Sequence, residues 1–197
     1  MFKVYLFSDF HHVTPEQLRR FSKVITPARR DKANTYKYSS GKVATVISEL
    51  LLRYALFEWT GSYQFELSYG TWGKPVLLYP RHLHFNISHC KEACVCVISD
   101  EEIGIDIEMI RSVSPSVIYR VCNEEEIELI RASADPEEEF IKRWVMKESY
   151  AKLSGVGLSR DFRTIDTLAN DKRFTFYRVQ NMFICVALNK KGEMKSA

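Results

Sequence analysis

The sequence predicts an α+β fold with antiparallel sheets, arranged in two halves that resemble each other. Three observations predict it. Helix-start signals fall into two groups along the 197-residue chain, a run of strand-like segments follows each group, and no Gly/Ser linker separates them. The order of helices, strands, helices and strands is typical of α+β proteins rather than of an alternating parallel sheet. Each half has a long helix followed by a turn containing glycine and a set of strands, which hints at an internal duplication.

Helix starts are marked by capping residues and prolines. Thr14-Pro15 with Gln17 forms a capping-box pattern, and Asn123 with Glu126 forms another. Further cap-plus-proline pairs stand at positions 26–27, 114–115 and 135–136. We expect helices over residues 15–24, 27–38, 42–58, 115–121, 124–133 and 137–154.

Strand signals lie between these helices. Runs of β-branched and aromatic residues with period-two alternation are typical of half-buried strands. We expect strands over residues 63–68, 83–88, 93–99 and 103–110 in the first half, and over 162–167, 173–179 and 182–188 in the second.

Composition restricts the class of protein. A hydrophobic content of 46% is enough for a packed core, and no stretch approaches the roughly 20 apolar residues that span a bilayer. The first residues lack the pattern of a secretory signal peptide, so we expect a cytoplasmic location. The five cysteines form no CxxC pair, and we expect reduced thiols that fill the core. The net charge of +3 is too small to indicate a nucleic-acid partner, and we expect neither nucleic acid nor a membrane as a partner.

The segment GIDIE at positions 104–108 places two carboxylates side by side. In an extended strand Ile103, Ile105 and Ile107 point to one face, whereas Asp106 and Glu108 point to the other. Mg²⁺ is commonly held by one or two carboxylates together with phosphate oxygens and water. An isolated pair of this kind is more often the solvated face of a half-buried strand, so the metal hypothesis depends on the accompanying motifs.

Two further segments supply donors for an anion. The strand FNISHC at positions 85–90 carries Ser88 on its polar side and His89 at its end, and this histidine could equally be a core residue with satisfied hydrogen bonds. The turn GKP at positions 73–75 presents the Lys74 ammonium, which alone is a weak indication.

The helix over 137–154 brings a third carboxylate. Glu148 and Lys152 are four residues apart and therefore share one face of the helix. They could form an ordinary surface ion pair, or they could supply a metal ligand and a lysine that neutralises phosphate charge.

Four segments together resemble the 4′-phosphopantetheinyl transferases of the surfactin-synthetase-activating type: GKP, FNISHC, GIDIE and WVMKESYAKLSGVGL (positions 144–158). They occur in the same order as in that family and at comparable separations along the chain. The resemblance runs from about residue 20 to residue 160. It implies a monomer of two pseudo-symmetric α/β halves, each a small, mostly antiparallel sheet packed with a long helix, which we place at residues 1–110 and 111–197. Cys90 and Ser149 depart from the family pattern, where serine and alanine are expected.

The resemblance also implies an activity and its ligands. The family transfers the phosphopantetheine arm of coenzyme A to a serine of an apo acyl or peptidyl carrier protein and releases adenosine 3′,5′-bisphosphate. By resemblance, Mg²⁺ would be held by Asp106, Glu108 and Glu148. Coenzyme A would be contacted by Arg29, Lys32, Thr45, Lys74, Ser88, His89 and Lys152.

The proton acceptor for the carrier serine stays open. Glu126 aligns with a glutamate proposed for this role in the family, although the same residue completes the capping box with Asn123. Glu148 or a water on the metal are the alternatives. By resemblance, then, the candidate catalytic residues are Glu126, Glu148, Lys152 and His89.

Two other functions use the same residues. One is an Mg²⁺-dependent phosphohydrolase that acts on coenzyme A or a nucleotide with water as the acceptor. The other is a relative that binds carrier proteins without catalysis, although a domain without catalysis has no need to keep the carboxylates and lysines together.

Overall fold

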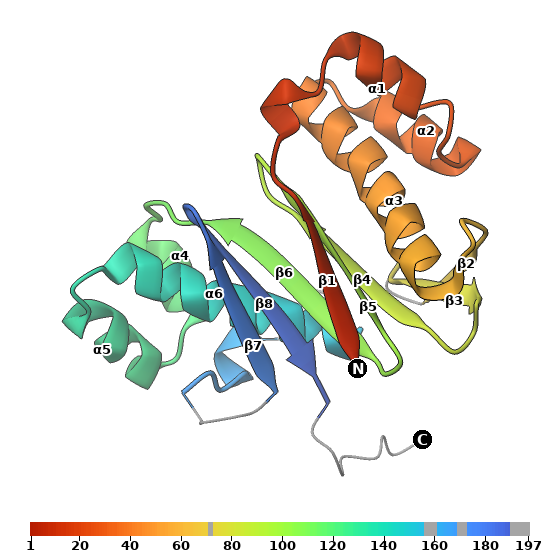
Figure 1. The fold of residues 1–197 in the computed structure, drawn as a ribbon. Coiled ribbons are helices and arrows are strands. Elements are labelled where there is room, and N and C mark those ends of the chain that lie inside the picture. The colour runs from red at the N-terminus through yellow and green to blue at the C-terminus, as the bar shows by residue number, and fades with distance from the viewer. Residues whose placement is uncertain (71–72, 156–160, 169–172, 190–197) are drawn as a thin grey trace. The chain divides into compact units, whose positions relative to one another are not determined.

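The computed structural model divides the chain into two compact units (Figure 1). It describes residues 1–70, 73–155, 161–168 and 173–189. The first unit comprises Met1–Ser68 and Pro75–Asp100, and the second comprises Tyr69–Lys74 and Glu101–Ala197. We had expected the halves to meet after residue 110. The division falls ten residues earlier because the strand over 103–109 pairs with the strand over 182–188.

The first unit is a three-stranded antiparallel sheet packed with a long helix. The strands β1 (Phe2–Phe7), β4 (His84–His89) and β5 (Cys94–Ser99) are ordered β1-β5-β4. The helix α3 (Ser39–Thr60) packs against β5 and buries a core that includes Leu52, Leu56 and Ile98. The shorter α1 (Pro15–Phe21) and α2 (Pro27–Thr35) lie on α3, and β2 (Glu66–Tyr69) pairs with β3 (Pro75–Tyr79).

The second unit repeats this arrangement. The strands β6 (Ile103–Met109), β7 (Phe174–Val179) and β8 (Met182–Leu188) form an antiparallel sheet in the order β6-β8-β7. The helices α4 (Pro115–Val121) and α5 (Glu124–Ala132) precede the long α6 (Pro136–Ser154), which packs on β6 and β8. Gly155 ends α6 with a φ of 69°, the left-handed conformation that glycine adopts without a steric cost.

Both units therefore share one topology. When β2 and β3 are set aside, the elements of each described unit follow the same order along the chain: one strand, three α-helices and two strands. In each unit the last of these strands lies in the middle of the sheet. The α+β class and the resemblance between the halves are confirmed. All six predicted helices are present, with ends displaced by a few residues.

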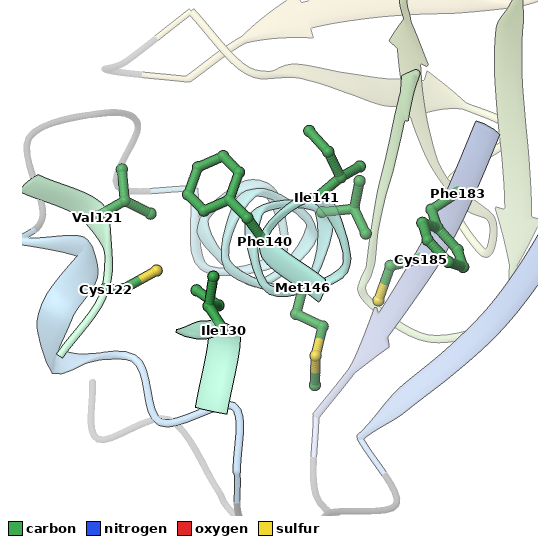
Figure 2. Close-up of a cluster of buried hydrophobic side chains, with 9 residues drawn as sticks. Val121, Cys122, Ile130, Phe140, Ile141, Met146, Phe183 and Cys185 are labelled. Carbon is green, nitrogen blue, oxygen red and sulfur yellow. The ribbon is translucent and has the colours of Figure 1, made fainter. Parts of the chain in front are cut away.

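The core of the second unit lies between α6 and the elements around it. Figure 2 shows Phe140, Ile141 and Met146 on α6, with Ile130 of α5 on one side and Phe183 and Cys185 of β8 on the other. Val145 is fully buried in the same cluster. This packing fixes α6 against its sheet.

Two of the strand predictions need correction, and two strands were missed. The strand predicted over 162–167 is wrong, because Phe162–Thr164 is a 3₁₀ helix whose backbone bonds a buried side chain of α6. The strand predicted over 63–68 begins only at Glu66. The sequence did not indicate β1 or β3, and β1 gains its partner, β5, only far along the chain.

The sequence also predicts reduced cysteines and no membrane-spanning segment. All five cysteines are free thiols; four are buried and Cys90 is partly buried. In the described parts of the chain, no helix combines the length and the apolar character needed to cross a bilayer.

Candidate functional site

The face of β6 that carries Asp106 and Glu108 lies beneath α6. Gly104 occupies the same face, and a Cβ atom there would lie 2.6 Å from the backbone nitrogen of Leu153 and closer still to the carbonyl oxygen of Ser149. Glycine at this position lets the helix backbone approach the strand directly. Asp106 is buried as a result, whereas Glu108 is partly buried.

Helix α6 presents its own functional side chains at this contact. Lys152 Nζ lies 2.6 Å from Asp106 Oδ1, so the lysine joins the helix to the strand. Ser149, where the family pattern has alanine, is fully buried and its hydroxyl donates to the carbonyl of Met146 at 2.9 Å. The serine is therefore accommodated inside the contact between helix and sheet without altering the charged groups.

The three carboxylates interact electrostatically. The pKa of Glu148 is raised to about 7, chiefly by burial; the charge of Asp106 and, to a smaller extent, that of Glu108 contribute to this rise, and the Lys152 ammonium opposes it. Burial, followed by the charge of Asp106, also raises the pKa of Glu108. Asp106, Glu108 and Glu148, which we call the carboxylate cluster, thus repel one another, although Arg111 and Lys152 partly offset this repulsion, and a bound cation would relieve it further.

Lys74 lies at the C-terminal end of α6. Its Nζ donates to the carbonyl oxygen of Leu153 at 3.0 Å, and its aliphatic chain passes close to Gly155. A cation at this position interacts favourably with the negative end of the helix dipole. The end of α6 therefore carries Lys74 and Lys152 together with the carboxylate cluster. Residues 156–158, the end of the WVMKESYAKLSGVGL string, lie outside the described residues.

The other candidate coenzyme A residues belong to the first unit. Arg29 on α2 donates from Nη2 to the carbonyl of Thr45 on α3 at 3.4 Å, and Thr45 itself is buried and donates from Oγ1 to Gly41. Lys32 extends from α2 with an exposed side chain. On β4, Ser88 is buried and His89 is exposed at the strand end. Arg29 and Thr45 are thus in contact.

Glu126 occupies a different environment from the carboxylate cluster. Its side chain is fully buried, and the capping box with Asn123 is present. It forms an ion pair with Lys147, which is also fully buried. Our sequence reasoning missed Lys147, although a signal existed: helical spacing places it on the apolar stripe of Phe140, Trp144 and Ala151.

The donor set suits a hard divalent cation. Within residues 1–70, 73–155, 161–168 and 173–189, no three His, Cys, Asp or Glu side chains are arranged to enclose a metal ion. Mg²⁺ does not need such an enclosure, because it retains waters and is bound through one or two carboxylates together with substrate phosphate oxygens. The mutual repulsion within the carboxylate cluster and its oxygen-only donors fit this ion.

Comparison with known proteins points to one family. Residues 102–190 match the model of the 4′-phosphopantetheinyl transferase superfamily. The chain is 28% identical over 151 residues to 4′-phosphopantetheinyl transferase Sfp of Bacillus subtilis (strain 168), which covers 75% of this chain and 67% of that relative. It is 36% identical over 89 residues to 4′-phosphopantetheinyl transferase gsp of Aneurinibacillus migulanus, covering 44% and 37% of the two chains.

A third relative gives the same result. 4′-Phosphopantetheinyl transferase psf-1 of Bacillus pumilus is 28% identical over 148 residues, with 73% of this chain and 64% of the relative covered. The aligned regions thus span about two thirds of the relatives Sfp and psf-1. The family match includes both β6 and α6, the elements that carry the carboxylate cluster. Residues 102–190 of the chain are therefore similar to the 4′-phosphopantetheinyl transferase superfamily.

Proposed function

We propose that this protein is a holo-[acyl-carrier-protein] synthase type of 4′-phosphopantetheinyl transferase that uses Mg²⁺. It transfers the phosphopantetheine arm of coenzyme A to a serine of an apo acyl or peptidyl carrier protein and releases adenosine 3′,5′-bisphosphate. The observation that carries the proposal is the carboxylate cluster, in contact with Lys152, inside the region that matches the family. The similarity to this family suggests the identity of the substrate.

In this proposal Asp106, Glu108 and Glu148 hold Mg²⁺. When bound, the ion supplies Lewis-acid polarisation of the diphosphate of coenzyme A. Lys152 and Lys74, both at the end of α6, bind the phosphate oxygens and balance the charge that develops on the leaving group. Positioning and charge neutralisation provide most of the catalysis, because the attacking and leaving atoms are both oxygens.

The transfer exchanges one P–O bond for another. The carrier serine Oγ forms a bond to the phosphorus that bears pantetheine, and the bond from this phosphorus to the bridging oxygen of the diphosphate breaks. We propose Glu148 as the acceptor of the serine proton.

Five residues of the first unit are proposed, from the resemblance to the family, to contact coenzyme A. Arg29 and Lys32 are the cations for the ribose 3′-phosphate, with Thr45, Ser88 and His89 as further contacts. The contact between Arg29 and Thr45 supports a shared role for these two residues. We further propose that the protein acts as a monomer in the cytoplasm, with an acidic carrier protein as its macromolecular partner.

Product analysis distinguishes transfer from hydrolysis. The protein is incubated with coenzyme A and Mg²⁺, with and without apo carrier proteins, and adenosine 3′,5′-bisphosphate is quantified. We expect release that depends on a carrier. Equal release without any carrier would identify a phosphohydrolase, and no release under either condition would indicate a binding protein without catalysis.

A further inference from the structure

Lys147 and Glu126 form an ion pair that is fully buried in the second unit. Lys147 Nζ lies 2.7 Å from Glu126 Oε2, and both side chains are 0% exposed. We propose that this pair positions α6, and through it Glu148 and Lys152, and that Glu126 is a positioning residue rather than the base. The proposal rests on the transferase function for the roles of Glu148 and Lys152.

The ammonium of Lys147 is fully engaged. Besides Glu126, it donates to the carbonyl oxygens of Phe162 at 2.8 Å and Ile165 at 2.7 Å. A lysine ammonium has three N–H donors, and three acceptors surround this one. Lys147 therefore ties α6 to α5 and to the segment over 162–165 at a single point.

Both carboxylate oxygens of Glu126 also have hydrogen-bond partners. Its Oε2 accepts from the backbone N–H of Asn123 at 3.0 Å and pairs with Lys147, while its Oε1 accepts from the hydroxyl of Thr167. A general base must come within hydrogen-bond reach of the proton that it removes. A carboxylate that is 0% exposed and bonded at both oxygens does not offer this access. The capping box accounts for the glutamate at this position.

Lys147 directly precedes Glu148 on α6, so the lysine of the buried ion pair lies next to the carboxylate cluster in the sequence. Successive residues of an α-helix are about 100° apart around its axis, so Lys147 and Ser149 point to nearly opposite sides, with Glu148 between them. Ser149 packs towards the sheet, where its hydroxyl lies 3.3 Å from Cys185 Sγ of β8. The helix is thus fixed on both sides of Glu148, which sets the direction of that carboxylate and of Lys152 one turn later.

The first test is Glu126→Gln, because glutamine keeps the shape and a carbonyl acceptor but cannot act as a base. We measure kcat at saturating Mg²⁺, the Mg²⁺ concentration for half-maximal transfer, and the Mg²⁺-induced rise in melting temperature. Loss of a group that orients a metal ligand weakens metal binding about 10-fold to 100-fold. We therefore expect the half-activating Mg²⁺ concentration to rise about tenfold, the Mg²⁺-induced thermal shift to fall, and kcat to change less than these binding readouts.

The matched control is Glu138→Gln. Glu138 of α6 pairs with the exposed Arg178 of β7, so this variant removes an ion pair of α6 that does not involve Lys147 or Glu126. We expect its half-activating Mg²⁺ concentration to stay within about twofold of the wild type.

The second test uses Lys147→Met with and without Glu126→Gln. Removing Lys147 alone leaves an uncompensated buried carboxylate, whereas the double variant removes both charges. We expect the double variant to transfer at least about ten times faster than Lys147→Met, because a broken buried pair costs more than its joint replacement.

Two results would contradict the proposal that Glu126 is a positioning residue. In the first, Glu126→Gln lowers kcat about 100-fold or more while the Mg²⁺-induced thermal shift is unchanged. In the second, the double variant transfers no faster than Lys147→Met. Either result would mean that Glu126 acts chemically, and the proposal would fail. If the wild type transfers to no carrier, the transferase function fails. The thermal shifts of the variants then decide the positioning role by themselves.

Discussion

At the scale of residues, the site is defined by three carboxylates that lie close enough to interact electrostatically. Asp106 is paired with Lys152 at 2.6 Å, while Glu108 and Glu148 have pKa values raised by burial and by the charge of Asp106. A protein gains no stability from three neighbouring carboxylates, since like charges repel. The proposed Mg²⁺ would relieve this repulsion.

Asp106→Ala tests this account of the cluster. We expect transfer to fall about 100-fold or more, the scale seen when a group that stabilises transition-state charge is removed. The fold should remain, because Lys152 is partly exposed and can be solvated once its partner is lost. Glu128→Gln, at an exposed position of α5, serves as the control and should transfer at the wild-type rate. Wild-type transfer by Asp106→Ala, measured with the same carrier, would refute the metal assignment.

The raised pKa of Glu148 predicts a pH dependence of stability in the metal-free protein. The folded pKa of about 7 lies above the ordinary value of 4.5, so the folded state binds more protons between these values. The contribution of Glu148 to stability is therefore fully present below about pH 4.5 and is lost as the pH rises through about 7. Melting temperatures in EDTA should fall over this window by more for the wild type than for Glu148→Gln. Parallel curves for the two proteins would contradict the assignment.

At the scale of elements, the close approach of α6 to β6 builds the site. The sequence indicated the two elements and the face that carries Asp106, because alternation along a strand and spacing along a helix are local properties. It could not indicate that Gly104 lies directly under Ser149 and Leu153, since this contact joins segments more than 40 residues apart. The strand predicted over 162–167 failed for a similar reason, because Lys147 of α6 holds the carbonyls of Phe162 and Ile165.

Gly104→Ala tests the contact between helix and strand. The added methyl group would meet backbone atoms of α6, which cannot move aside as a side chain would. We expect the free energy of unfolding to fall by about 1–3 kcal/mol or more, the range of overpacked cores, together with a loss of transfer. The control is Gly70→Ala, where the nearest atom to a new Cβ is 3.8 Å away. Urea unfolding curves that superimpose for Gly104→Ala and the wild type would contradict the contact.

At the scale of the whole molecule, two units of one topology carry different residues. The carboxylate cluster lies in the second unit, together with Lys74 and Lys152, while Arg29, Lys32, Thr45, Ser88 and His89 lie in the first. The capping boxes and the six helices could be predicted from local sequence, and so could the α+β class. The strand order β1-β5-β4 could not, because β1 pairs with a strand from the opposite end of its unit.

The central claim is that the chain transfers phosphopantetheine to a carrier protein. The most direct measurement is the intact mass of several apo acyl and peptidyl carrier proteins after incubation with this protein, coenzyme A and Mg²⁺. We predict that at least one carrier gains the mass of a single phosphopantetheine arm, and that neither EDTA treatment nor the Asp106→Ala variant gives this gain. An unchanged mass for every carrier in the presence of Mg²⁺ and coenzyme A would contradict the claim.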